Sequence, residues 1–417
     1  MSPRVVITGM GALSAAGEGA RTLWQAVSEG RTGLGRVDAP GASGSWQVLA
    51  GVVRDFSPER YVTQRKALKV MARDIQLAVG ASSLAMEDAG LKGTASHPER
   101  FGVIVGSGVL NHELDELAYS IQNSLDEQGK LDLQKFGDSG LSSLFPLWLL
   151  KYLPNMPACH ISILFDLQGL NNTITTGASA GLQAVGEAFR IIQRGDADRM
   201  LCGGAESKVN PVGISQYRVL GAISDPLTSL ATDYRPFDAN SRGFVVGEGA
   251  AFLVLEELSQ ARARNAKIYA EVVGFGASSV NGRAAAMQEA LNDAGIRPQD
   301  LSYLQAAGLG LKEDDEREAR AIEEVFNGSG KGLSVSASKA VTGFTGFSAG
   351  ALDLVISTKA LHYQTVPPAA HYTPSGAERS FSIATEKISK KELRYAMTNA
   401  FGFNGQAVSV VTKAWEA

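Results

Sequence analysis

Short apolar runs that end at a glycine recur along this chain, and they constrain its fold more than any other feature. Three such runs cover residues 5–8, 103–105 and 200–202, and a glycine follows each one. Uninterrupted runs of this kind are typical of strands that are buried on both faces. Amphipathic segments of helical length lie between the runs, and the clearest covers residues 182–194. Strands that alternate with helices predict an α/β fold with mostly parallel sheets.

The alternation of strands and helices occurs twice, which predicts an internal duplication. The first series covers about residues 1–258, and the second covers 259–417 and closes with the apolar residues 407–412. Residues 120–144 are polar and interrupt the first series. With their flanks, about residues 107–155, they predict an excursion from the core, either a surface loop or an element that contacts a partner.

The composition narrows the classes of function. The net charge is −4 and no basic stripe is present, which argues against nucleic-acid binding. The two cysteines, Cys159 and Cys202, form neither a disulfide framework nor a metal-binding spacing. We find no apolar run of about 18 residues and no signal-peptide pattern. We therefore expect a soluble cytoplasmic protein with no membrane span, no metal and no cofactor.

Residues 8–14 carry a partial dinucleotide-binding pattern directly after the first apolar run. The third glycine of that pattern is replaced by Ser14, and no acidic residue follows at the expected distance. A tight turn between a strand and a helix, without a cofactor, is the favoured interpretation.

Residues 173–182 predict a strand, a sharp glycine turn and the start of a helix, and they contain Gly-Ala-Ser-Ala-Gly. This matches the G-x-S-x-G turn that carries the nucleophile of α/β-hydrolases, with Ser179 as the nucleophile. A hydrolase also needs a histidine and an acid later in the chain. The available residues are His362, His371, Asp314 and Asp315. In the alternative interpretation, the Ser179 hydroxyl only caps the following helix.

A further series of motifs extends from one end of the chain to the other. It comprises VVITGMG at 5–11, GGAE at 203–206, RPFD at 235–238, RGFVVGEGA at 242–250 and NAFGFNG at 399–405. In this series the chain resembles the β-ketoacyl synthases, condensing enzymes that elongate acyl chains on acyl carrier proteins. The resemblance implies a thiolase-like fold with a duplicated five-layer α-β-α-β-α arrangement. It also implies that 1–258 and 259–417 are the two ketosynthase halves.

The catalytic positions of that family are altered in this chain. The resemblance places Ala178 where the family has its cysteine nucleophile, and Ala307 and Phe344 where it has two histidines. The threonines that contact the pantetheine arm are replaced by Leu309 and Leu311. No acyl-enzyme can form without a thiolate, and neither an alanine nor a phenylalanine can polarise a thioester. We therefore expect no catalysis by this chain and a pantetheine channel filled by leucine side chains.

A silent ketosynthase of this kind resembles the chain-length factors of type II polyketide synthases. Such a subunit forms a heterodimer with an active ketosynthase, serves an acyl carrier protein through the complex, and shapes the tunnel that sets chain length. Those factors carry glutamine at the cysteine position, so Ala178 indicates another branch, such as one making reduced polyenes or fatty-acid-like products. The competing hypothesis is an acyl hydrolase or acyltransferase that uses Ser179, although the same alignment places both candidate histidines away from the pocket.

The resemblance also assigns residues to the interface, the tunnel and a loop near the site. The strand at about 171–176 would pair with the partner, and a helix around 145–153 would lie at the interface. The candidate tunnel and interface residues are Val109, Leu110, Leu114, Asn171, Asn172, Thr173 and Ile174. The C-terminal gating loop would contain Phe401, Gly402 and Phe403.

Overall fold

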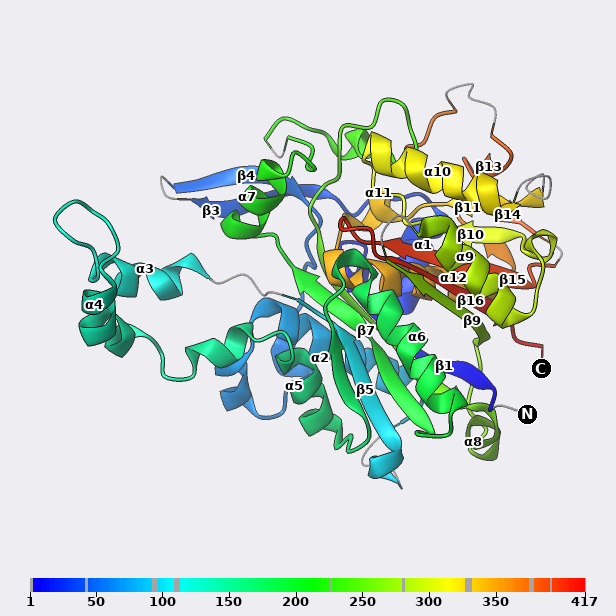
Figure 1. Ribbon diagram of the computed structural model, residues 1–417, viewed down its shortest axis with the longest axis horizontal. Coiled ribbons are helices and arrows are strands. Elements are labelled where there is room, and N and C mark those ends of the chain that lie inside the picture. Colours follow the sequence, from blue (N-terminus) through cyan, green and yellow to red (C-terminus); the bar gives the residue numbers. More distant parts are fainter. Residues whose placement is uncertain are drawn as a thin grey trace.

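A computed structural model gives the architecture of the chain (Figure 1). It describes residues 3–41, 44–91, 97–108, 113–225, 227–279, 282–326, 332–374, 379–390 and 392–416. One large sheet dominates the described part. Its main strands are β1 (Val5–Ser14), β5 (Phe101–Gly106), β6 (Asn171–Ile174), β7 (Arg199–Ser207), β8 (Glu248–Glu257), β9 (Ala270–Ser278), β10 (Tyr303–Gln305), β11 (Ser334–Ser336), β15 (Tyr395–Phe401) and β16 (Ala407–Ala414).

The sheet contains the same strand order twice. One half has the order β1-β8-β7-β5-β6, and the other has β9-β16-β15-β10-β11. If the five strands of each half are numbered in chain order, their order across the sheet is 1-5-4-2-3 in both halves. The two first strands, β1 and β9, pair antiparallel and join the halves. The predicted duplication of an α/β unit is confirmed.

The expectation of mostly parallel sheets is wrong, because the sheet is mixed. In each half, the second strand is parallel to its two neighbours, as β5 is to β6 and β7. The fifth strand is antiparallel to both of its neighbours, as β8 is to β1 and β7. β15 and β16 form a hairpin across the short connection 402–406, and a short connection requires antiparallel strands.

Helices cover the outer faces of the two halves of the sheet, and others pack between the halves. α2 (Arg73–Asp88) and α5 (Met156–Phe165) cover strands of the first half, and α9 (Arg283–Ala294) and α10 (Lys312–Phe326) lie on the second half. α6 (Ala180–Gln193) and α12 (Ala349–Tyr363) pack against each other and against strands of both halves. Residues 349–361 of α12 are all buried, which makes this helix part of the central layer. The other helices are α1 (Ala20–Ser28), α3 (Leu114–Gln122), α4 (Leu133–Lys135), α7 (Pro211–Val219), α8 (Leu258–Ala263) and α11 (Lys339–Thr342).

The partial dinucleotide pattern at 8–14 is neither a cofactor loop nor the predicted turn. These residues continue β1 to its end at Ser14. A Cβ atom on Gly9 would lie 2.3 Å from the Ala85 carbonyl oxygen, and one on Gly11 would lie 2.0 Å from that of Ala81. The two glycines therefore allow α2 to lie close against the strand.

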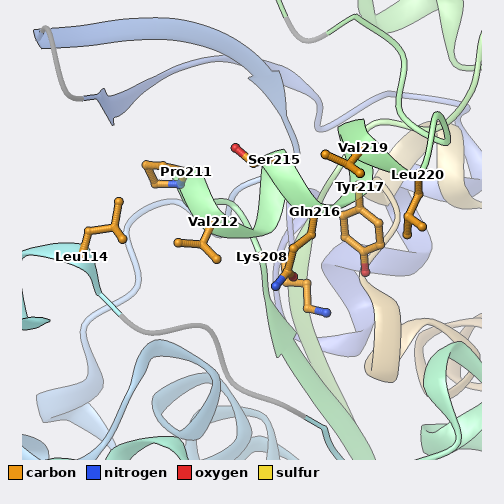
Figure 2. Close-up of a pocket in the computed structure, with 9 residues that line it drawn as sticks. All are labelled: Leu114, Lys208, Pro211, Val212, Ser215, Gln216, Tyr217, Val219 and Leu220. Carbon is orange, nitrogen blue, oxygen red and sulfur yellow. The ribbon is translucent and has the colours of Figure 1, made fainter. Parts of the chain in front are cut away.

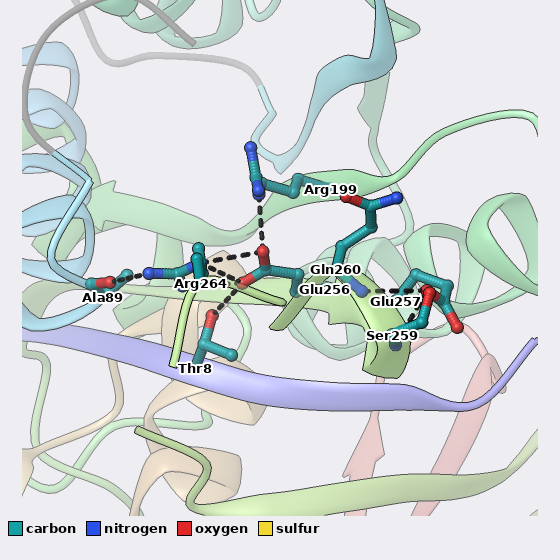
Figure 3. A network of polar contacts seen from close by, with 8 residues as sticks. All are labelled: Thr8, Ala89, Arg199, Glu256, Glu257, Ser259, Gln260 and Arg264. Carbon is teal, nitrogen blue, oxygen red and sulfur yellow. Dashed lines mark hydrogen bonds and ion pairs between the residues drawn. The ribbon is translucent and has the colours of Figure 1, made fainter. Parts of the chain in front are cut away.

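A buried carboxylate ties three elements of the first half together (Figure 3). Glu256 on β8 pairs with Arg199 of β7 and with Arg264, which follows α8, at 2.6 Å in each case. It also accepts a hydrogen bond from the Thr8 hydroxyl of β1. Burial alone would raise the pKa of Glu256, but the hydrogen bonds from Arg264 and Arg199 bring it below its usual value. The ion pairs with two arginines and the hydrogen bond from Thr8 together offset the cost of burying the Glu256 charge.

The excursion at about 107–155 projects from the body as an arm that carries α3 and α4 (Figure 1). The arm is less polar than the sequence suggested, because large apolar side chains on it are exposed. They are Leu114, Tyr119, Ile121, Leu131, Leu133, Leu141, Phe145, Leu147 and Leu149. The helix expected around 145–153 is a 3-10 turn over Trp148–Tyr152. Such a set of exposed apolar side chains is typical of a protein–protein contact surface.

The remaining strands are short or peripheral. β3 (Gly35–Gly41) and β4 (Gly44–Ala50) form a separate hairpin, and the others are β2 (Gly17–Glu18), β12 (Thr365–Val366), β13 (Ser382–Ile383) and β14 (Ile388–Ser389). Within the described ranges, no helix combines the length and apolar character needed to cross a membrane. The same ranges contain no group of three or more histidine, cysteine, aspartate or glutamate side chains placed to hold a metal ion.

Candidate functional site

The site is built around the turn between β6 and α6. Gly177 has a φ of 67°, a conformation that glycine adopts without strain, and it begins a 3-10 turn that ends at Ser179. Ala178 lies at the middle of this turn and is only 7% exposed. At the position where the resemblance expects a nucleophile, the turn carries a buried methyl group.

Bulky side chains fill the space around Ala178. One cluster of buried residues includes Ala178, Tyr217, Phe244, Leu309 and Phe344, and Leu311 packs against it. The rings of Phe244 and Phe344 lie 4.5 Å apart between centroids, and Tyr217 meets both rings edge-on. Leu309 is 3% exposed and Phe344 is 2% exposed. The structure thus brings together four of the altered positions, Ala178, Leu309, Leu311 and Phe344, as one apolar packing unit.

The backbone of Phe344 is held on both sides. Its N–H donates to the Val245 carbonyl oxygen, and its own carbonyl oxygen accepts from the Gly247 N–H, each at 2.8 Å. Val245 and Gly247 belong to the glycine-rich segment 242–250. Because the backbone is fixed, the Phe344 ring is directed into the cluster.

Two carboxylates of α10 hold the loop at 307–311. Glu318 accepts hydrogen bonds from the N–H groups of Ala307 and Gly308, both at 2.9 Å. Asp315 accepts from the N–H groups of Gly310 and Phe237. Burial raises the pKa of Glu318, and it raises that of Asp315 to about 7. The Ala307 methyl group lies in a small neighbouring cluster with Ala286, Phe401 and Ala407.

A buried ion pair lies in the same region, and the sequence analysis did not identify it. Lys339 Nζ lies 2.6 Å from Asp353 Oδ2, and both side chains are almost completely buried. Ser338 and Gln305 also donate to Asp353. Burial raises the pKa of Asp353, whereas the Lys339 charge opposes that rise. Lys339 and Asp353 are 14 positions apart in the sequence, and only the fold places them side by side.

The proposed gating loop lies against the turn. Phe401 ends β15 and is buried, whereas Phe403 is 44% exposed. A Cβ atom on Gly402 would lie 3.2 Å from the Thr176 carbonyl oxygen, so glycine allows close approach to the turn. The Phe403 ring lies 5.6 Å from that of Phe344. The loop therefore closes the aromatic cluster on its outer side.

The structure contradicts a capping role for the Ser179 hydroxyl. Ser179 precedes α6, but its hydroxyl donates to the Thr176 carbonyl oxygen at 2.8 Å and forms no side-chain cap. Ser179 is fully buried, and among the described residues no histidine or carboxylate is hydrogen-bonded to it. The hydroxyl stabilises the turn in this arrangement and has no general base.

The downstream residues that a hydrolase would need are bound to groups other than Ser179. His362 is on α12, edge-on to the Tyr269 and Tyr363 rings. His371 contacts the Tyr234 carbonyl oxygen at the edge of the cluster. Asp315 holds the 307–311 loop, and Asp314 pairs with Arg283. The geometry therefore assembles no catalytic triad around Ser179 from these candidates.

A surface cavity of about 730 Å³ lies beside the cluster, along α7 (Figure 2). Its lining is largely apolar and includes Val212, Val219 and Leu220. Leu114, at the start of the arm, lines it from the opposite side. Tyr217 lines the cavity and also packs against Phe344, so its ring forms the wall between cavity and cluster. The other two candidate tunnel residues, Val109 and Leu110, lie outside the described residues.

The strand expected at the interface is an edge strand. β6 is the last strand of the sheet and pairs only with β5 on its inner side. Asn171 and Asn172 are exposed, and Thr173 and Ile174 are half-buried. An edge of this kind presents backbone donors and acceptors that a strand of another chain can use.

The structure also brings together three acids that are far apart in the sequence and share no motif. Asp74, Glu206 and Glu248 are all buried. Glu206 accepts from the Phe347 N–H and lies 3.1 Å from Lys208, and Glu248 pairs with Arg73. Burial raises the pKa of Asp74 to about 7, and the charges of Glu206 and Glu248 add to the rise. These acids hold β7, β8 and the segment after Phe344 together.

The repeated strand order and the central helix pair define a thiolase-like ketosynthase fold. The chain belongs to the β-ketoacyl synthase family. Residues 2–261 match the β-ketoacyl synthase N-terminal domain, and residues 263–373 match the C-terminal domain.

Individual relatives cover almost the whole chain. The 3-oxoacyl-[acyl-carrier-protein] synthase 2 of Staphylococcus aureus (strain COL) is 33% identical over 425 residues, covering 99% of each chain. A solved structure titled as the ishigamide ketosynthase/chain length factor superposes with a TM-score of 0.83 at 25% identity, covering 100% of both chains. A type II PKS acyl-carrier protein complex with its ketosynthase gives a TM-score of 0.80, also at 25% identity and full coverage of both chains.

Proposed function

We propose that this chain is a non-catalytic ketosynthase subunit that forms a heterodimer with an active β-ketoacyl-ACP synthase. In the complex it shapes the tunnel for the growing polyketide or acyl chain and so limits chain length. The observation that carries the proposal is the packing of Ala178 against Leu309 and Phe344. At this place a synthase needs a thiolate, a histidine and an open channel for the pantetheine arm.

The form of the substitutions supports a non-catalytic role over a damaged catalyst. Loss of a nucleophile alone would leave an open polar pocket. Here the neighbouring positions carry larger apolar groups, and Phe344 stacks into an existing aromatic cluster. A well-packed cluster stabilises the fold, whereas a functional pocket usually costs stability. The architecture has been kept while the channel has been filled.

Two exposed surfaces support partnership with a second ketosynthase-like chain. Among the described residues, no strand pairs with the outer edge of β6, and the arm carries exposed leucines. One of the similar solved structures bears the name of a ketosynthase/chain length factor, and another contains an acyl-carrier protein. By analogy, the acyl carrier protein would deliver its substrate to the active partner in the complex.

The test is a condensation assay with separated and combined subunits. This chain alone should neither decarboxylate a malonyl carrier protein nor elongate an acyl chain. Co-expressed with an active ketosynthase, it should be part of an elongating complex. Replacing the partner's catalytic cysteine by alanine should abolish elongation, whereas Ser179→Ala in this chain should leave it unchanged. Decarboxylation or elongation by this chain alone would reject the proposal.

A further inference from the structure

A second cleft lies at the C-terminal end of α12, away from the site described above. Its volume is about 520 Å³, and it is lined by Arg21, Lys267, Lys359, Tyr269 and the start of α1. Ten residues separate Lys359 from the beginning of α12 at Ala349. At 1.5 Å per residue this is about 15 Å along the helix. The cleft therefore does not share its residues with the cluster around Ala178.

Lys359 is the unusual residue of the cleft. Its side chain is 5% exposed, and its ammonium group lies 4.4 Å from the centre of the Tyr269 ring. Among the described residues, no carboxylate or carbonyl oxygen accepts a hydrogen bond from it. Burial lowers the pKa of Lys359, and the charges of Lys267 and Arg21 lower it further, against the effect of Asp88. The ammonium group contacts a ring face but none of the described carboxylates, and it lines the cleft, so an anion in the cleft can pair with it.

The two carboxylates of the cleft only partly offset the charge of its cations. Both oxygens of Asp88 are engaged, one by the Tyr269 hydroxyl at 2.7 Å and the other by the Met10 N–H at 2.9 Å. Glu87 is exposed at the rim. Lys267 donates to the Tyr269 hydroxyl. Three cations therefore face two carboxylates, which leaves a net positive charge.

The first turn of α1 adds backbone donors to this charge. The residue before the helix is Gly19, no side chain caps the turn, and the first turn contains no acid. The first N–H groups of a helix lack partners within the helix and carry a partial positive charge. Gly19 and Ala20 line the cleft, so the positive end of α1 lies beside the same space as Arg21 and Lys359.

From the buried Lys359, the net positive charge and the uncapped start of α1 together, we infer that the cleft binds a small phosphate-bearing ligand. Phosphate oxygens can accept from the ammonium groups, from Arg21 and from the α1 N–H groups at once. The Tyr363 ring, which lines the same cleft and stacks on Trp24, offers a flat surface next to the phosphate position. The inference goes beyond the proposed function and does not depend on it.

Isothermal titration calorimetry on the full chain, at constant ionic strength, tests the inference. Pyrophosphate is the probe, and ADP is the second arm, which separates a nucleotide from a simple phosphate compound. We expect saturable binding of pyrophosphate that weakens at least tenfold in Lys359→Met and in Arg21→Met. The matched control is Lys387→Met, since Lys387 is an exposed lysine outside the cleft, and it should bind as the unaltered chain does.

Thermal unfolding separates loss of the site from loss of the fold. Lys359→Met removes a buried charge but keeps an apolar stem, so its ligand-free midpoint should equal or exceed that of the unaltered chain. Arg21 is exposed, so Arg21→Met should fold normally in any case. Absence of saturable binding up to millimolar pyrophosphate and ADP would overturn the inference. So would binding that neither substitution weakens.

Discussion

The rings of Phe244 and Phe344 lie 4.5 Å apart at an interplanar angle of 43°, and both are almost completely buried. Phe344 stands where the family resemblance places a histidine, and Phe244 belongs to the glycine-rich segment that holds its backbone. The position to which the resemblance assigns a histidine is thus part of the hydrophobic core. Aromatic pairs of this geometry add stability beyond the area they bury.

Truncating Phe344 should therefore cost stability. We expect Phe344→Ala to lower the free energy of unfolding by about 3–5 kcal/mol, because it leaves a cavity in a packed cluster. Phe403→Ala is the matched control, since Phe403 contacts the same cluster but is 44% exposed, and it should cost clearly less. Guanidinium denaturation measures both. Equal small losses would mean that Phe344 does not support the core.

The outer edge of β6 gives a selective test of the interface. The Val103 N–H donates to the Leu170 carbonyl oxygen, and the Ser107 N–H donates to that of Ile174. Since backbone groups alternate in direction along a strand, those of residues 170, 172 and 174 face β5. The backbone N–H and carbonyl groups of Thr173 therefore face outward, away from β5. The Thr173 N–H donates to the Asn172 side-chain oxygen at 2.8 Å in the single chain. Thr173→Pro should thus remove this outward donor without removing a bond to β5.

We expect Thr173→Pro to fold and to lose the heterodimer, as measured by size-exclusion chromatography with the co-expressed partner. Thr173→Ala, which shortens the same side chain but keeps the backbone N–H, serves as the control. A Thr173→Pro chain that still forms the complex would show that β6 does not pair across the interface.

Tunnel shaping can be tested at a described residue. Leu114 begins α3, is 52% exposed and lines the cavity beside Tyr217. In the complex, Leu114→Trp should shorten the product, because the larger ring fills space that the growing chain would use. Mass spectrometry of the released products measures the change, with Leu133→Trp on the same arm as the control. Unchanged product length would remove Leu114 from the tunnel.

Asp74 predicts a pH dependence of stability. Its carboxyl ionises near pH 4 in an unfolded chain but near pH 7 in the folded protein. Between these values the folded protein binds more protons, so this group lowers the free energy of unfolding as pH rises. The slope for one proton is at most about 1.4 kcal/mol per pH unit.

Asp74→Asn should make the free energy of unfolding less dependent on pH between 5 and 7, as measured by urea denaturation. Asp225→Asn is the control, since Asp225 is exposed and its pKa is lowered, so it stays ionised across this range. An unchanged slope in Asp74→Asn would contradict the raised pKa.

Much of the fold could be predicted from the sequence, because apolar runs and helical spacing are local signals. The positions of β1, β5, β7 and α6 follow from them, and so does the duplication. Strand direction is not encoded in a run that is apolar throughout, which is why the mixed pairing was missed. Residues 8–14 were misassigned because glycines that admit a close helix resemble glycines that form a turn.

For the site, aligned motifs identified Ala178, Leu309 and Phe344, but not what surrounds them. The partners of Lys339 and Ala307 are acids whose role depends on the fold, since Asp353 and Glu318 lie on separate helices. The cleft at Lys359 has no local pattern at all. Its cations come from α1, α12 and the residues before β9, and only the tertiary structure brings them together.

Native mass spectrometry of this chain, co-expressed with a ketosynthase that has an intact cysteine and two histidines, tests the central claim most directly. We predict a one-to-one complex that persists through purification and replaces any homodimer of this chain. A homodimer that does not exchange subunits with the active ketosynthase would contradict the account.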